Sequence, residues 1–275
     1  MNKYYNCKMN KLNTPVSVTY ASELKKVEAQ AVAEKLGLPC LQVSESHTAL
    51  NLNFTDDFVE LRDSEKNIAI HIDFISGELA HRQQYGGGKG QAIAKAIGIK
   101  QGIEPPTVLD ATAGLAKDAF VLACLGCPMT LLERSPVIVE LIRDAIRRAS
   151  DDEQFQLILD NGFDLIEQSS IDYLLSFLSN EDSDNTEDAR PDVIYLDPMY
   201  PERKKSASVK KNMQLLQNLL GKDEDTQALL DIALKIARKR VVVKRPKGAE
   251  SLSALKPGYQ VASKKTRYDI YLVPG

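Results

Sequence analysis

Hydrophobic positions along this chain follow two different patterns. Up to about residue 80, five short segments alternate apolar and polar positions as strands do: "VSVTY", "CLQV", "ALNLNF", "FVELRD" and "IAIHIDF". Between the first two lies "ASELKKVEAQAVAEKLGL", in which Leu24, Val27, Ala31 and Leu36 recur at helical spacing before Gly37 ends the helix. The pattern predicts a small α+β unit over residues 1–80.

From about residue 105 the chain changes to a repeated succession of strand, tight turn and helix. "PVIVELIRDAIRRA" has the clearest helical spacing. Strands that alternate with helices form right-handed βαβ units, in which helices cover both faces of a mostly parallel sheet. We therefore expect an α/β domain over residues 81–275, doubly wound around a seven-stranded sheet. Its strands are predicted at "TVLD", "MTLLE", "FDLIEQ", "DVIYL", "RVVVK", "YQVAS" and "YDIYLV".

Two segments interrupt these patterns. Residues 180–191, "NEDSDNTEDARP", are acidic and aperiodic, which predicts an exposed loop. Residues 85–91, "YGGGKGQ", lack the spacing of a phosphate-binding P-loop. They are interpreted as a hinge between the two domains, or alternatively as a backbone approach to a ligand, and the helix "GQAIAKAIGI" is expected to begin there.

Composition narrows the class of protein. The chain has 275 residues, 43% of them hydrophobic, a net charge of −3 and a pI near 5.8, which supports a proper core and argues against a uniformly basic nucleic-acid coat. No stretch approaches the roughly 20 apolar residues that cross a bilayer. We expect a soluble cytoplasmic protein without a membrane segment. Cys124 and Cys127 lack matching partners for zinc, so we expect buried thiols and no metal.

The first predicted turn of the sheet has the residues of a ligand site. In doubly wound sheets, ligands bind beyond the carboxyl ends of the strands. Here the strand ends at Asp110 in "LDATAGLAKDAF", where Ala111, Ala113, Gly114 and Ala116 would let a ligand approach the backbone. The Asp110 carboxylate suits a cationic ligand group.

The second strand ends in another acid. Glu133 follows Asp110 by 23 positions, close to the offset of about 20 at which an acid reaches ribose hydroxyls in dinucleotide folds. The turn lacks the G-x-G-x-x-G fingerprint, and a pyrophosphate would match an acid poorly. These features favour S-adenosylmethionine, whose ammonium and sulfonium groups are positive, over NAD.

The fourth strand ends in "DPMYP", at the same edge of the predicted sheet. The exocyclic amine of a nucleobase is a poor nucleophile, and acceptors for its N–H groups would hold its lone pair toward a methyl donor. We assign this role to the Asp197 carboxylate and the Pro198 carbonyl, and expect Tyr200 to stack on the base. The alternative is a proline turn with a half-buried tyrosine.

Two groups of cations follow this turn and suggest contacts with phosphates. The first is Arg203, Lys204, Lys205, Lys210 and Lys211 in "ERKKSASVKK". The second surrounds the "RVVV" strand and comprises Lys235, Arg238, Lys239, Arg240, Lys244, Arg245 and Lys247. Solvated surface charge is the alternative for either group alone, but both are predicted near one edge of the sheet.

"LDATAGLAKDAFVLACLGC", "LLERSPVI" and "YLDPMYPERKKSASVKK" together resemble the ribosomal small-subunit RNA methyltransferase J family. The resemblance implies a class I, Rossmann-like methyltransferase that transfers a methyl group from S-adenosylmethionine to a guanine N2 amine of 16S rRNA, free or in the small ribosomal subunit. It implies cofactor contacts at Lys117, Asp118, Glu133, Arg134, Ser169, Ser170 and Asp197. Family members often have Gly and Arg where this chain has Ala116 and Lys117. Compared with the N-P-P-Y motif of many amino-methyltransferases, Asp197 and Met199 replace Asn and the second Pro.

Other functions stay open from the residues alone. The same turn could present a protein glutamine amide, or another nucleic-acid amine, to the methyl donor. A nicotinamide-dependent oxidoreductase is disfavoured by the absent glycine fingerprint, and a noncatalytic RNA-binding protein would lack cofactor affinity. The small N-terminal unit is expected to help position RNA, and the pattern predicts no oligomeric state.

Overall fold

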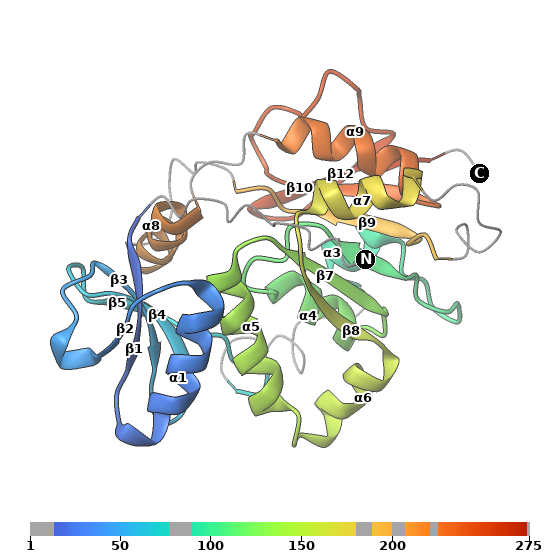
Figure 1. The fold of residues 1–275 in the computed structure, drawn as a ribbon. Coiled ribbons are helices and arrows are strands. Elements are labelled where there is room, and N and C mark those ends of the chain that lie inside the picture. Colours follow the sequence, from blue (N-terminus) through green and yellow to red (C-terminus); the bar gives the residue numbers. More distant parts are fainter. Residues whose placement is uncertain (1–13, 77–89, 180–188, 200–206, 221–224, 274–275) are drawn as a thin grey trace. The chain divides into compact units, whose positions relative to one another are not determined.

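A computed structural model describes residues 14–76, 90–179, 189–199, 207–220 and 225–273 (Figure 1). The chain forms two compact units, one of residues 1–70 with 205–222 and one of residues 71–204 with 223–275. The sequence pattern predicts a single boundary near residue 80, which lies outside the described residues. Residues 205–222 thus belong to the N-terminal unit, although they follow the fourth strand of the large sheet in sequence.

The N-terminal unit is built on a five-stranded sheet in the order β2-β1-β3-β4-β5. β1 is parallel to β2 and β3, whereas β4 is antiparallel to β3 and β5. The predicted strands are confirmed, and α8 is added from the distant segment. The elements are β1 (Val16–Tyr20), α1 (Glu23–Leu36), β2 (Cys40–Gln42), the 3₁₀ turn η1 (Val43–Glu45), β3 (Leu50–Phe54), β4 (Val59–Asp63), β5 (Ile68–Ile70) and α8 (Ala207–Leu220).

Helix α1 buries a different face from the one that carries Leu24 and Val27. Ala29, Ala33 and Leu36 are buried, whereas Leu24 is 90% exposed and Val27 is 76% exposed. The buried positions follow an i, i+4, i+7 spacing, and two alanines let the helix lie close to the sheet. Apolar spacing alone therefore indicated the helix but not its buried face.

The second unit contains the predicted seven-stranded sheet, in the order β11-β12-β10-β9-β6-β7-β8. β8, β7, β6, β9 and β10 run parallel, and β12 is antiparallel to β10 and β11. The strands are β6 (Val108–Asp110), β7 (Met129–Glu133), β8 (Phe163–Glu167), β9 (Val193–Leu196), β10 (Arg240–Pro246), β11 (Tyr259–Ala262) and β12 (Thr266–Leu272). The doubly wound fold predicted from the sequence is confirmed.

Helices cover both faces of this sheet (Figure 1). On one face, α7 and α9 pack on a core that includes Leu109, Ile194 and Val243. On the other face lie α4, α5 and α6, and stacked rings of Phe74, Phe120 and Phe155 pack among them. The helices are α3 (Ala92–Ile97), α4 (Lys117–Cys124), α5 (Pro136–Ala149), α6 (Glu153–Asn161), α7 (Ser170–Ser179) and α9 (Thr226–Ile236).

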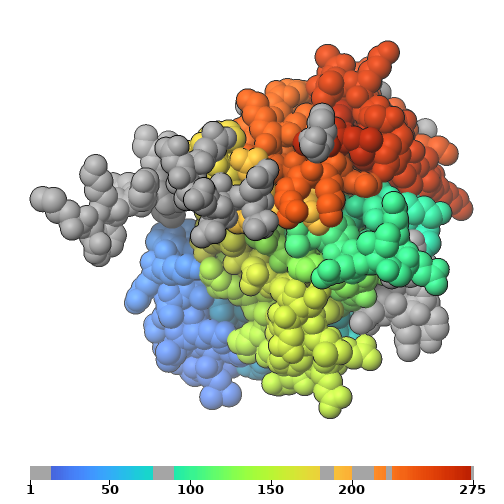
Figure 2. Space-filling model, turned by 90° about the vertical axis from the view of Figure 1, so that its right-hand side faces the viewer, coloured from blue at the N-terminus to red at the C-terminus, as the bar shows by residue number. Residues whose placement is uncertain are grey.

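The beginning and the end of the second unit pack together. Helix α3 contacts β10, β11 and β12, and Figure 2 shows residues near 100 beside the C-terminal strands on one surface.

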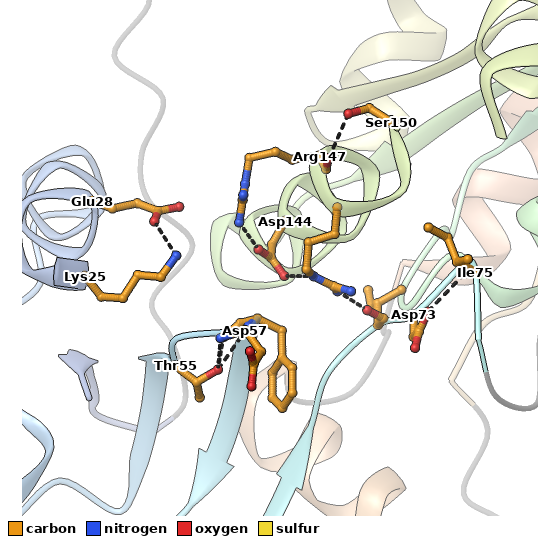
Figure 3. A network of polar contacts seen from close by, with 12 residues as sticks. Lys25, Glu28, Thr55, Asp57, Asp73, Ile75, Asp144, Arg147 and Ser150 are labelled. Carbon is orange, nitrogen blue, oxygen red and sulfur yellow. Dashed lines mark hydrogen bonds and ion pairs between the residues drawn. The ribbon is translucent and has the colours of Figure 1, made fainter. Parts of the chain in front are cut away.

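The first residues of the unit are held by α5, because Arg148 donates to the Ile72 carbonyl while it binds the buried carboxylate of Asp144 at 2.7 Å. Arg147 binds the same Asp144 at 2.6 Å (Figure 3).

Candidate active site

The strand order places the predicted site at a topological switch point. β6 has β7 on one side and β9 on the other, and the chain leaves all three strands at the same edge of the sheet. Asp110 ends β6, Glu133 ends β7, and Asp197 directly follows β9. Ligands of open α/β sheets bind where such exits diverge. The predicted convergence of the three acids is confirmed.

The sheet register decides which side chains share a face. Asp110 pairs with Tyr195, and Tyr195 pairs with Val242 of β10. Because side chains alternate along a strand, Asp197 and Lys244, two positions further along their strands, lie on that same face. Ile194 and Leu196 point to the opposite face, into the α7 and α9 core. The acids and Lys244 are therefore assembled by strand pairing.

Asp110 is the most deeply buried acid of this edge. It is 2% exposed, and its carboxylate accepts a hydrogen bond from the Thr112 N–H at 3.0 Å. Burial raises the pKa of the Asp110 carboxyl to about 8, and the nearby carboxylates of Asp118 and Asp197 add to this rise. A cation that reached this edge would favour the ionised carboxylate.

Glu133 organises the first turn. Its Oε2 accepts from the Gly114 N–H at 3.0 Å, and its Oε1 accepts from the Ser135 N–H at 2.7 Å. Gly114 has φ of 53°, a left-handed conformation that favours glycine, although a Cβ there would meet only the Thr112 carbonyl at 3.8 Å. Ala116 has φ of 54° just before α4, so the chain adopts the glycine-like conformation there with an alanine.

Asp197 is held from two directions. Its backbone N–H donates to Thr112 Oγ1 at 2.6 Å, and its Oδ2 lies 2.8 Å from Lys244 Nζ. The same ammonium lies 2.6 Å from Asp118 Oδ2, which also accepts from the Tyr195 hydroxyl at 2.6 Å. Pro198 is buried beside Asp197, and Tyr200 lies outside the described residues.

This network sets the charge of its members. Burial by itself would lower the pKa of Lys244, but the carboxylates of Asp197 and Asp118 more than compensate and raise it. Burial raises the pKa of Tyr195 as well, and the Asp118 carboxylate adds to that rise. Lys244 is therefore an ammonium, and the Tyr195 hydroxyl is neutral.

The other predicted cofactor residues occupy different places around this edge. Ser170 begins α7 and donates to the Ala111 carbonyl at 2.6 Å, which ties the exit of β8 to the exit of β6. Ser169 directly precedes α7. Lys117 is exposed at the start of α4. Arg134 forms an ion pair with Asp225 at 2.8 Å.

The cations predicted to contact RNA can be followed in the structure only in part. Arg203, Lys204 and Lys205 lie outside the described residues, and Lys210 and Lys211 lie in α8. In the second group, Arg240 pairs with Val193 at the opposite edge of the sheet. Arg245 is 4% exposed and donates to the Glu250 carbonyl. The second group is not gathered at one edge of the sheet, because Arg240 begins β10 and Lys244 lies near the other end of that strand.

Three contributors were missed by the sequence reasoning: Thr112, Tyr195 and the role of Lys244 within the site. A signal for Lys244 existed. It is a charged residue directly after three buried valines of a central strand, and an unpaired ammonium is costly at such a position. Tyr195 breaks the aliphatic run of β9 in a similar way.

The residues at this edge fit S-adenosylmethionine. The acids Asp110, Asp118 and Asp197 all interact with Lys244, and acidic groups suit a ligand with ammonium and sulfonium groups. Ser135 Oγ is buried beside Glu133 and has no hydrogen-bond partner among the described residues, so a ligand hydroxyl would satisfy it. Glu133, the acid predicted to bind a ribose, is held in this turn by the N–H groups of Gly114 and Ser135.

Of the two predicted buried thiols, Cys127 is buried and Cys124 is partly exposed, and burial raises the pKa of both to about 12. Within the described residues, no group of three or more His, Cys, Asp and Glu side chains is arranged to hold a metal ion. Over the same residues, no helix is both long enough and apolar enough to span a membrane.

Comparisons with known proteins point to one family. A family model described as "Putative SAM-dependent methyltransferase" matches residues 31–273. The protein named ribosomal RNA small subunit methyltransferase J of Shewanella piezotolerans is 46% identical over 88% of this chain and 86% of its own length. The protein of that name from Aeromonas salmonicida is 44% identical, over 90% of this chain and 94% of its own length.

A solved structure extends the similarity to the fold. The crystal structure of a SAM-dependent methyltransferase from Neisseria gonorrhoeae has a TM-score of 0.69 and is 31% identical, over 94% of this chain and 96% of that one. Sequence and fold agree over nearly the whole length. The chain is an S-adenosylmethionine-dependent methyltransferase and belongs to the ribosomal RNA small subunit methyltransferase J family.

Proposed function

We propose that this enzyme transfers the methyl group of S-adenosylmethionine to the exocyclic N2 amine of a guanine in 16S rRNA, in the cytoplasm. The observation that carries the proposal is the placement of Asp197, fixed at the exit of β9 beside the acids of β6 and β7. The similarity to proteins named ribosomal RNA small subunit methyltransferase J supports the RNA substrate.

When bound, S-adenosylmethionine supplies an activated methyl group, whose carbon–sulfur bond breaks as the new nitrogen–carbon bond forms and sulfur becomes neutral. The protein must hold the amine and take up its charge. The Asp197 carboxylate can accept an amine N–H, so that the nitrogen lone pair stays out of the ring and the departing proton has an acceptor. The Pro198 carbonyl is proposed as the second acceptor and Tyr200 as the stacking ring.

The proposed cofactor contacts are those predicted from the sequence: Asp110, Gly114, Lys117, Asp118, Glu133, Arg134, Ser169, Ser170 and Asp197. The strongest support is for Asp110, Gly114 and Glu133, which line the turn after β6 together. Arg134 forms an ion pair with Asp225, and Lys117 is exposed. We therefore place both residues at the outer margin of the proposed cofactor site.

The proposed RNA contacts are Arg203, Lys204, Lys205, Lys210 and Lys211. This segment directly follows the Asp197 turn in sequence and then enters α8, whose Leu215, Leu216 and Leu219 are buried in the N-terminal unit. Deleting residues 1–80 would expose these leucines, so the deletion is a poor test of whether the N-terminal unit positions RNA. Replacing Lys210 and Lys211 by Glu is the better test.

The experiment uses labelled S-adenosylmethionine with 16S rRNA and with small subunits that lack the modification. We expect label in one nucleotide, identified by mass spectrometry as N2-methylguanine. Asp197→Ala should lower the rate about 100- to 1000-fold, the range for loss of one preorganised group that interacts with the reacting atoms. The exposed Asp151→Ala is the matched control.

Label in protein instead of RNA would favour a glutamine amide, and label at another nucleic-acid amine would move the target. Absence of transfer to either rRNA substrate, or full activity of Asp197→Ala, would refute the proposed function.

A further inference from the structure

Lys244 forms an ion pair with Asp197 and another with Asp118. Its Nζ lies 2.8 Å from Asp197 Oδ2 and 2.6 Å from Asp118 Oδ2. The lysine side chain is 24% exposed and that of Asp118 is 16% exposed, whereas that of Asp197 is 40% exposed. Asp118 thus holds Lys244 from the protein side, and Asp197 faces outward from the same ammonium.

The position of Lys244 is fixed independently of Asp197. Its strand is paired on both sides, with β9 and with β12, and it follows the buried Val241, Val242 and Val243. Asp118 is fixed in turn by the Tyr195 hydroxyl at 2.6 Å. A charge held this firmly acts on Asp197 without reorganising, which is the condition under which electrostatic preorganisation is effective.

The surroundings of Asp197 would otherwise oppose its ionisation. Asp197 and Asp118 both bind the Lys244 ammonium, and Asp197 also interacts with the buried Asp110, whose pKa is about 8. Like charges at such short range favour protonation of one member, and Lys244 opposes this for Asp197. Within the described part of the chain, the titratable groups that interact with this network include Asp110 from β6, Asp118 from α4, Tyr195 from β9, Lys244 from β10 and Tyr268 from β12.

We propose that Lys244 is a positioning residue, whose ammonium keeps the Asp197 carboxylate ionised and aimed at the amine to be methylated. The inference rests on the proposed function in one respect, the role of Asp197 as acceptor for the amine. It reassigns Lys244 from a possible phosphate contact to the support of the reacting groups. Lys244 itself needs no contact with RNA or cofactor.

A purely structural ion pair would leave a different signature. Loss of an ion pair that only stabilises the fold would lower activity by a similar factor at every pH. Loss of a charge that keeps Asp197 ionised has an effect that depends on pH, because a higher pH restores the carboxylate. The pH profile therefore separates the two roles.

The experiment compares Lys244→Met and Lys244→Gln with wild type. Glutamine retains a hydrogen-bond donor without the charge, and it gives a folded variant if methionine does not. At pH 7 we expect kcat to fall about 10- to 100-fold in both variants, and to recover partly as pH rises to 9. The exposed Lys256→Met is the matched control and should keep the wild-type profile.

A second readout does not require an RNA substrate. Carbon-13 NMR of labelled aspartate carboxyls, with the Asp197 signal assigned from Asp197→Asn, follows ionisation of this group directly. In both Lys244 variants we expect the midpoint to move upward far enough that only about a tenth of the Asp197 carboxyls or fewer are ionised at pH 7, as a 10-fold fall in kcat requires. An unchanged midpoint, or a pH-independent loss of kcat, would overturn the proposal. If wild type transfers no label to RNA, the proposed function fails, and the NMR titration still decides the role of Lys244.

Discussion

Replacing Asp110 by asparagine should make the protein more stable and less able to bind its cofactor. The asparagine side chain would keep the acceptor for the Thr112 N–H and nearly the same volume, but the substitution would remove a carboxylate that is 2% exposed. An ionisable group that is buried for function lowers the free energy of unfolding, and a neutral substitution shows by how much. Asp110 is the residue of this edge where the cost is most directly measured.

The magnitude follows from the two pKa values. The Asp110 carboxyl has an ordinary pKa of 3.8, and burial raises it to about 8 in the folded protein. The difference is about 4 pH units, which corresponds to about 6 kcal/mol at about 1.4 kcal/mol per unit. The folded state binds a proton that the unfolded state has lost, so stability falls as pH rises from 3.8 to 8. Below the ordinary pKa both states are protonated, and the penalty vanishes.

The assay is urea unfolding of wild type and Asp110→Asn without cofactor at pH 5, 6, 7 and 8. The advantage of the variant should grow by about 3 kcal/mol between pH 5 and pH 7, at about 1.4 kcal/mol per unit. Other groups titrate in both proteins and cancel in the difference. The exposed Asp151→Asn serves as control. An advantage that stays constant with pH would refute the reasoning, because it would show that Asp110 is ionised in both states.

Four further predictions test neighbouring parts of the molecule. Calorimetry should show S-adenosylmethionine binding more tightly as pH rises from 6 to 8, with proton release, and Asp110→Asn should remove this dependence; binding independent of pH in wild type would contradict it. Thr112→Val leaves the Asp197 N–H without its partner, so it should lower the free energy of unfolding by about 1–3 kcal/mol and should lower kcat. Thr112→Ser should retain both the stability and the kcat, as measured by unfolding and methyl transfer. Gly114→Ala should cost about 1–2 kcal/mol in unfolding experiments, because φ is 53° while space for the methyl group exists; a neutral effect would show that the turn relaxes. Leu219→Ala should cost about 2–5 kcal/mol, and hydrogen exchange should locate the loss of protection in the N-terminal unit, whereas loss confined to the large sheet would contradict the position of α8.

Much of the fold follows from local pattern. The βα succession indicated each strand of the large sheet, because buried parallel strands are continuous apolar runs and their helices have clear periodicity. Local pattern could not indicate that residues 205–222 join the N-terminal unit. Leu215, Leu216 and Leu219 read equally well as a helix that packs on either unit, and the choice depends on which surface is complementary.

The candidate site divides in the same way. Asp110, Glu133 and Asp197 could be predicted because each follows a recognisable strand, and parallel strands end at one edge. The sequence shows only that Lys244, Arg240 and Arg245 are close along the chain, and on that ground they form one basic group. In the structure these three residues have different surroundings. Lys244 lies at the edge of the candidate site and Arg240 at the opposite edge of the sheet, and the buried Arg245 donates to the Glu250 carbonyl.

The sequence by itself therefore determined the type of fold and the edge of the sheet at which Asp110, Glu133 and Asp197 meet, because these depend on the period of apolar residues and on the direction of the strands. Only the tertiary structure decided how those acids are charged. The pKa of Asp110 depends on burial, and Asp197 forms an ion pair with Lys244, which lies 47 positions further along the chain. Strand pairing brings them together, and no local pattern encodes that distance.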